Sequence, residues 1–298
     1  MKGVFPIITT PYTIYGDVDL ESLQNVMVTR HRAGVNGFVL FGIGGEYYKQ
    51  TDDEGKNMLF AVTEASKKLA TPLVVSVTQH ATVAACKAAQ YYEQAGADIL
   101  MVLPPFFLKP SGEDVYNHIK TIAKSVKIPI LVQYAPEQTG VSISTDIWRR
   151  LSNECENVND FKIECKPSGH YISSMMTSFK QTPNIYIGNC GLQMIEALDR
   201  GALGVMPGCA FAEVYVKIYQ NYIAGNRSKA VSLHNALMPL LNHIRQSVEM
   251  LNHYEKRILK MRGIIDTDYC RAPGFVPDQH DDELFFAFYS QLEPLLTE

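Results

Sequence analysis

Lys162 is a charged residue within a short, mostly apolar segment, and this combination points to chemistry. The segment 158–165 reads Val-Asn-Asp-Phe-Lys-Ile-Glu-Cys, a pattern typical of a β-strand. A lysine that points inward from such a strand loses hydration, which favours a neutral amine able to attack a carbonyl carbon. Lys162 is therefore a candidate Schiff-base lysine. The structural alternative packs the lysine stem along the sheet, with the ammonium in solvent or beside a carboxylate such as Glu164.

Two further polar side chains belong to the same hypothesis. Tyr134 ends an earlier apolar run at 130–134, where its phenol could move protons or could simply end a strand with its hydroxyl in water. Glu164 lies two residues after Lys162, so the alternation of a strand places both on one face. A carboxylate so close favours the ammonium, unless the two groups share a proton or bind substrate between them.

A glycine-rich segment, Gly42-Ile-Gly-Gly-Glu46, directly follows the second predicted strand. Without side chains, its backbone N–H groups can approach a carboxylate or phosphate closely. A plain tight turn is the alternative interpretation of the same residues.

The elements that would position these residues alternate regularly along the chain. Short runs rich in β-branched residues predict strands at 4–9, 37–41, 73–78, 98–103, 128–134, 160–164, 184–187 and 202–206. Each is followed by a segment of helical period. Eight such units favour a closed (β/α)8 barrel, or TIM barrel, over a doubly wound open sheet. The open sheet would also call for Gly-x-Gly-x-x-Gly after the first strand, where the chain has Thr9-Thr-Pro-Tyr12.

The alternation ends near residue 225, and three helical segments follow at 227–251, 252–263 and 281–296. No linker rich in Ser, Gly or Pro precedes them. We therefore predict that residues 1–225 form the barrel that carries the active site, and that residues 226–298 form a three-helix appendage packed on it.

Composition excludes several classes of partner. The chain has 298 residues and a net charge of -4, with no basic stripe for nucleic acid. The first residues lack the features of a signal peptide, and no apolar run reaches the roughly 18 residues that a membrane span needs. We expect a cytoplasmic protein that binds neither membrane nor nucleic acid. The six cysteines and eight histidines show no metal-ligand spacing, so no metal site is predicted.

Taken together, these features resemble the dihydrodipicolinate synthase and N-acetylneuraminate lyase family of class I aldolases. The resemblance covers nearly the whole chain. The spacing of 28 residues between Tyr134 and Lys162, combined with the Gly-x-x-Gly-Glu motif and the eightfold order, is far more specific than any single motif. Its other motifs are Gly42-Ile-Gly-Gly-Glu46, Pro104-Pro-Phe-Phe107, Pro136 with Gly140, Gly188, Gly204-Val-Met-Pro207 and Arg271-Ala-Pro-Gly-Phe275.

The resemblance implies that Lys162 forms an imine with pyruvate or another 2-oxo acid, without a cofactor, and that Tyr134 moves the protons. The substrate carboxylate would rest against the N–H groups of Gly44 and Gly45. Met206 and Gly188 would contribute to the same substrate site. The family also implies a homo-oligomer, either a tetramer built from dimers or a dimer.

The chain departs from the family's synthases at several positions. Ile43 and Gly44 stand where the synthases have two hydroxyl-bearing residues, and Phe107 stands where they have a tyrosine. Gln138 occupies the place of an arginine that clamps the second substrate, and its amide cannot supply a charged bidentate fork. Aspartate semialdehyde is therefore not the expected substrate.

Glu164 differs from the synthases by adding a functional group, because the synthases usually have a small residue at this position. A carboxyl group near the imine can take a proton from C3 or assist the departure of a C4 hydroxyl. The alternative is that Glu164 pairs at the rim with Lys166 or His170.

We therefore predict a Schiff-base lyase that acts on a 2-oxo-3-deoxy sugar acid or a related hydroxylated 2-oxo acid. Aldol cleavage, with pyruvate as a product, and dehydration both remain open. The alternatives are a dihydrodipicolinate synthase that condenses pyruvate with aspartate semialdehyde, and a barrel that binds a 2-oxo acid without turning it over.

Overall fold

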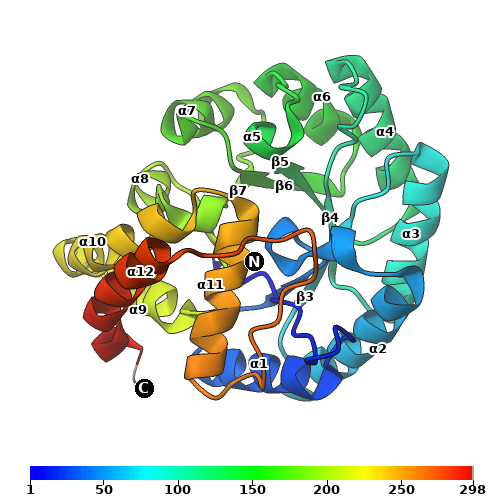
Figure 1. Cartoon of the computed structure of the whole chain (residues 1–298). Coiled ribbons are helices and arrows are strands. Elements are labelled where there is room, and N and C mark those ends of the chain that lie inside the picture. The colour runs from blue at the N-terminus through cyan, green and yellow to red at the C-terminus, as the bar shows by residue number, and fades with distance from the viewer. Residues whose placement is uncertain (297–298) are drawn as a thin grey trace. The chain divides into compact units, whose positions relative to one another are not determined.

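The computed structural model describes residues 1–296 (Figure 1). The chain divides into two compact units. Unit 1 comprises Met1–Thr71 and Pro207–Glu298, and unit 2 comprises Pro72–Met206. Each unit is described by itself.

Unit 2 contains six parallel strands, each hydrogen-bonded to the next in chain order. Their residues are almost all buried, as expected for parallel strands that are covered on both faces. The strands are β3 (Leu73–Val77), β4 (Ile99–Val102), β5 (Ile130–Tyr134), β6 (Val158–Ile163), β7 (Asn184–Ile187) and β8 (Gly204–Val205).

Helices follow the strands of unit 2 and lie along their outer side (Figure 1). Local sequence explains several of their ends. The Ser111 hydroxyl and the Asp114 carboxylate form a reciprocal capping box at the start of one helix, and Gly96 ends another in the left-handed conformation. The helices are α3 (Thr82–Ala95), α4 (Gly112–Ser125), α5 (Pro136–Thr139), α6 (Thr145–Glu154), α7 (Ser168–Ser178) and α8 (Met194–Asp199), with a short turn η3 (Asn189–Gly191) after β7.

The two faces of β6 have different neighbours. The Phe161 ring lies 6.3 Å from the Trp148 ring of α6 and 5.6 Å from the Phe179 ring that follows α7, so this face packs on the helices. Lys162 therefore points to the opposite face of the sheet, together with Asp160 and Glu164.

Unit 1 contains the two short strands β1 (Gly3–Val4) and β2 (Phe38–Leu40). Beyond β1, Ile7 pairs in parallel with both Val39 and Gly208. The remaining elements are α1 (Leu20–Arg32), η1 (Ile43–Gly45), η2 (Tyr47–Lys49), α2 (Asp52–Leu69), α9 (Ala212–Ile223), α10 (Arg227–Ile244), α11 (Val248–Met261), α12 (Gln279–Leu292) and η4 (Glu293–Leu295).

Eight parallel strands that alternate with helices confirm the predicted (β/α)8 fold class, and α10 to α12 are its C-terminal helices. Several predicted boundaries differ from the observed ones, and two of these differences are large. The first C-terminal helix ends at Ile244, and Ser247 caps the next one through the Met250 N–H. The predicted strand 4–9 is reduced to the strand Gly3–Val4 and two isolated bridges at Ile7, in part because Pro6 has no N–H to donate to a ladder.

Within residues 1–296, no helix is long and apolar enough to cross a membrane. The same part of the chain contains no group of three or more His, Cys, Asp or Glu side chains that could hold a metal ion.

Candidate active site

Lys162 lies near the carboxyl end of β6 with only 4% of its side chain exposed. Its Nζ atom is 3.4 Å from the Oε1 atom of Glu164, whose own side chain is 11% exposed. The amine is therefore desolvated, and a carboxylate is its immediate neighbour. This is the arrangement that the alternation of the strand predicted for the two side chains.

The Glu164 carboxylate is held by donors at both of its oxygens. Gln133 Nε2 donates to Oε2 at 2.6 Å, and the backbone N–H of Asn189 donates to Oε1 at 2.9 Å. The predicted alternative pairing of Glu164 with Lys166 is wrong, because Lys166 forms its ion pair with Glu137 at 2.7 Å. Glu164 thus belongs to the face of Lys162 and not to the rim.

Gly188, a predicted substrate-binding residue, makes room for Glu164. A Cβ atom added to Gly188 would lie 2.4 Å from both Cγ and Oε1 of Glu164, far inside van der Waals contact. Only a glycine at the end of β7 therefore allows the carboxylate to keep its present place.

The turn after β7 has an unusual backbone. Asn189 and Cys190 both have φ of 55°, and Gly191 has φ of 68°, so three successive residues are left-handed. This conformation is costly for residues other than glycine and is often found at functional sites. Here the left-handed turn directs the Asn189 N–H at the Oε1 atom of Glu164. The Asn189 carboxamide is 5% exposed, and neither of its polar atoms finds a partner within residues 1–296.

The placement of Tyr134 corrects the sequence-based assignment. The register pairs Gln133 with Lys162 and Tyr134 with Ile163. Tyr134 therefore lies on the helix-facing side, where its ring stacks on Tyr171 with centroids 4.8 Å apart. Its hydroxyl accepts from the Ile143 N–H at 3.3 Å, and burial raises the pKa of the phenol. This position argues against proton transfer to Lys162.

An irregularity in the pairing of β5 and β6 explains why the sequence wrongly placed Tyr134 beside Lys162. Ile130 pairs with Val158, but Leu131 pairs with Asp160, so Asn159 is skipped. An uninterrupted register would have paired Tyr134 with Lys162. The extra residue moves Gln133 into that place. Gln133, a polar residue within an apolar strand, was the available signal, and sequence reasoning missed it.

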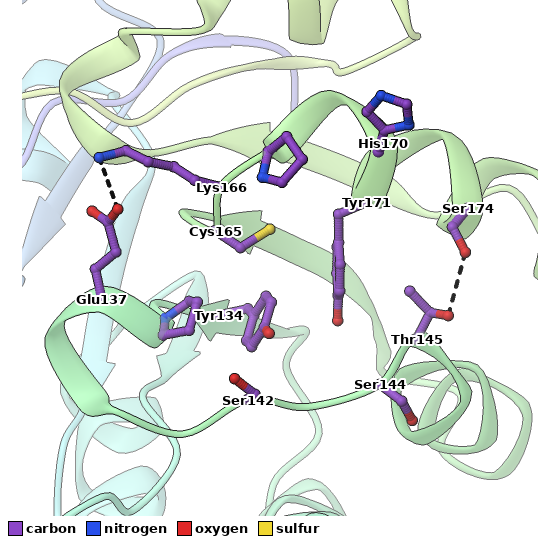
Figure 2. Close-up of a pocket in the computed structure, with 12 residues that line it drawn as sticks. Tyr134, Glu137, Ser142, Ser144, Thr145, Cys165, Lys166, His170, Tyr171 and Ser174 are labelled. Carbon is purple, nitrogen blue, oxygen red and sulfur yellow. Dashed lines mark hydrogen bonds and ion pairs between the residues drawn. The ribbon is translucent and has the colours of Figure 1, made fainter.

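A pocket of about 670 Å³ lies on the helix-facing side of β5 and β6. Figure 2 shows that the Tyr134 and Tyr171 rings line it, with the Lys166–Glu137 ion pair at one edge and a hydrogen bond between Thr145 and Ser174 at another. Neither Lys162 nor Glu164 is among the residues that line it. It is therefore separate from the face that carries the lysine.

The two other predicted binding residues of unit 2 have different positions. Met206 directly follows β8 and is buried, and the register of β6, β7 and β8 places it on the sheet face of Lys162. Gln138 lies in α5 with an exposed side chain, and its N–H donates to the Ala135 carbonyl at 3.2 Å.

Unit 1 contains the glycine-rich segment, and its two candidate glycines differ. The Gly45 N–H donates to the Gly42 carbonyl at 2.9 Å, so the turn itself uses this donor. A Cβ atom on Gly45 would also come within 2.7 Å of the Ile8 carbonyl oxygen. At Gly44 the nearest heavy atom to an added Cβ is Asn252 Oδ1, at 3.9 Å. The predicted pair of anion-binding glycines is thus reduced to Gly44.

The glutamate of this motif has a structural role in unit 1. Glu46 is fully buried and forms ion pairs with Lys49, at 3.0 Å, and with Lys256. The Lys256 ammonium and the Arg271 guanidinium both lie over the Tyr12 ring, 4.3 and 4.4 Å from its centroid. These contacts tie the segment after β2 to α11 and to the C-terminal tail.

Comparison with solved structures shows that the fold is a known one. The structure of the 4-hydroxy-tetrahydrodipicolinate synthase from Methylacidiphilum fumariolicum SolV matches with a TM-score of 0.91 at 23% identity, covering 99% of this chain and 97% of that one. The chain is therefore a (β/α)8 barrel, and it carries a buried lysine, Lys162, near the end of its sixth strand.

The family follows from the sequence comparison. Residues 1–286 match the dihydrodipicolinate synthetase family, and the chain belongs to it. It is 24% identical to the L-2-keto-3-deoxyarabonate dehydratase of Azospirillum brasilense, over 99% of this chain and 96% of that protein. It is 27% identical to the 4-hydroxy-tetrahydrodipicolinate synthase of Thermotoga sp. (strain RQ2), over 90% of each. The chain is thus a lyase of the class I aldolase type.

Replacing Gly188 with alanine is expected to reduce turnover by about tenfold or more, because the new methyl group must displace the Glu164 carboxylate from its donors. Steady-state rates and circular dichroism of G188A would check this. Gly55→Ala in α2, where an added Cβ has only an ordinary contact at 3.9 Å, is the matched control. Wild-type turnover in G188A would contradict the packing argument.

Removing the Tyr134 hydroxyl is expected to leave the chemistry at Lys162 within about twofold of wild type, because the hydroxyl bonds to Ile143 on the other face. The cost should appear in the free energy of unfolding, at about 1 kcal/mol for one lost hydrogen bond. Rates and urea unfolding of Y134F would test both. A hundredfold loss of turnover would restore Tyr134 as a catalytic residue.

Proposed function

We propose that the chain is a Schiff-base lyase that removes water from, or cleaves, a 2-oxo-3-deoxy sugar acid, and we favour dehydration. The observation that carries this proposal is the buried pair of Lys162 and Glu164, with 3.4 Å between Nζ and Oε1. The dehydratase among the relatives supports the same reaction class.

In the first step the Lys162 amine attacks the C2 ketone, and loss of water leaves an iminium. The positive nitrogen then acts as an electron sink for the bonds at C3. Since the imine itself withdraws the electrons, the proposed reaction needs no cofactor.

Glu164 is suited to act as the base in the next step. Its contacts with Gln133 and Asn189 come from N–H groups, which can only donate, so the carboxyl accepts at both oxygens. An ionised carboxylate beside the imine nitrogen can take a proton from C3, which converts the iminium to an enamine.

Dehydration then follows without another residue. The enamine expels the C4 hydroxyl group, which takes the proton that Glu164 had gained and leaves as water. The product carries a C3–C4 double bond conjugated with the iminium. Hydrolysis frees the Lys162 amine and the unsaturated 2-oxo acid.

Cleavage needs a base at the C4 hydroxyl instead, so that the C3–C4 bond breaks and the enamine of pyruvate remains on Lys162. The sequence offered Tyr134 for this proton, but Tyr134 lies on the opposite face of the sheet. This is why dehydration is preferred.

Substrate recognition is assigned to residues that present unused polar groups or apolar surface. The buried carboxamide of Asn189 next to Glu164 suits a hydroxyl of the sugar acid. Met206 contributes apolar surface on the same face, and Gly44 remains the candidate for a carboxylate. Gln138 cannot supply the charged fork of a guanidinium, which speaks against aspartate semialdehyde. We also propose a homo-oligomer, a tetramer or a dimer.

Borohydride reduction in the presence of pyruvate or a 2-oxo-3-deoxy acid is expected to add the reduced ligand to Lys162, as read by peptide mass. K162A should lose the adduct, because the other strongly buried lysines within residues 1–296, Lys49 and Lys256, are paired with Glu46. Lys166→Ala, which removes a half-exposed lysine paired with Glu137, is the control and should keep it. An adduct on Lys166, or none on any lysine, would refute the Schiff base at Lys162.

Glu164→Gln is expected to separate imine formation from elimination. The amide retains the size of the side chain but takes no proton, so turnover of a 2-oxo-3-deoxy acid should fall by about 100-fold or more. Trapping of pyruvate on Lys162 should persist. Glu137→Gln, at the ion pair with Lys166, is the matched control. Full turnover by E164Q would exclude Glu164 as the base, and release of pyruvate from the sugar acid would identify cleavage instead of dehydration.

A further inference from the structure

We infer that Gln133 is a positioning residue of the reaction, which holds Glu164 as an ionised base directed at the Lys162 nitrogen. This inference rests on the proposed function and adds a residue to it.

The position of Gln133 is unusual for its type. It is 1% exposed, within a strand whose other residues are Ile130, Leu131, Val132 and Tyr134. Burying a carboxamide is costly unless its polar atoms are bonded. Here its Nε2 atom donates to Glu164 Oε2 at 2.6 Å, a short bond to a charged acceptor. The skipped Asn159 in β6 is what brings Gln133 opposite Lys162.

The contacts of Glu164 show what this bond does. Gln133 binds Oε2, whereas the Asn189 N–H and the Lys162 Nζ atom both lie at Oε1. A carboxylate held at both oxygens cannot rotate freely about its last bond. Gln133 therefore keeps one oxygen occupied so that the other faces the reacting nitrogen.

The same bond also places a donor against the charged end of Glu164. The Gln133 N–H faces Oε2 at 2.6 Å and stabilises negative charge on that oxygen. Without this donor, the acidic limb of the pH profile of turnover is expected to move to higher pH. A glutamine that merely fills space would leave the pH dependence of turnover unchanged, and this difference makes the inference testable.

Two variants at this position test the inference. Q133L keeps the approximate size and removes the donor, and Q133E faces Glu164 with a second carboxyl group. Turnover of a 2-oxo-3-deoxy acid should fall by about 10- to 100-fold in Q133L, chiefly in kcat, the loss expected for one hydrogen bond to a charged group. The acidic limb of the kcat profile should move to higher pH in Q133L, which loses the donor, and further in Q133E, which places a like charge opposite Glu164.

Borohydride trapping of pyruvate on Lys162 should remain within about threefold of wild type in Q133L, since imine formation does not need the oriented base. Gln181→Leu and Gln181→Glu, at an exposed glutamine of the same unit, are the matched controls. Circular dichroism confirms that each variant is folded.

The outcomes separate the two proposals. Unchanged pH profiles in Q133L and Q133E, with wild-type trapping and turnover intact, would overturn the role of Gln133 alone. Equal losses of trapping and turnover with no shift of the acidic limb would show that Gln133 only supports the fold. Absence of any Lys162 adduct in the wild-type protein would overturn the proposed function together with this inference.

Discussion

The carboxylate of Glu164 is a buried charge, and most of the site can be understood as the means by which it is tolerated. Such a group is costly unless both oxygens are bonded and a counter-charge is near. Its donors are Gln133 on β5 and the Asn189 N–H after β7, and its cation is Lys162 on β6. Three neighbouring strands must therefore be aligned before this one side chain is satisfied.

The free space at Gly188 and the backbone conformation of the next residues also accommodate the Glu164 carboxylate. Gly188 has no side chain where the Glu164 carboxyl lies, and the next three residues follow a left-handed path. Asparagine accepts that conformation more readily than most residues. The surrounding structure holds the backbone of the turn in this strained conformation. As a result, the Asn189 N–H is directed at a charged oxygen of Glu164.

An aromatic layer lies on the other side of the same strands. Tyr134, Trp148 and Phe161 pack against one another between the sheet and the helices. The Lys162–Glu164 pair lies on the opposite face of β6. Because successive residues of a strand alternate between the faces, a shift of one position brings Gln133, and not the Tyr134 phenol, beside Glu164.

The sequence by itself determined the features that depend on local order. Eight alternating units predicted the (β/α)8 class, and two-residue alternation placed Lys162 and Glu164 on one face. Tertiary structure decided which residue of β5 meets them, because the answer depends on Asn159 being skipped between two strands. It also decided that Gly188 makes room for Glu164 and that Gly45 uses its own N–H. The spacing of residues along a chain does not specify the register between two strands. The spacing of 28 residues therefore pointed to Tyr134 as the neighbour of Lys162, whereas in the folded protein that neighbour is Gln133.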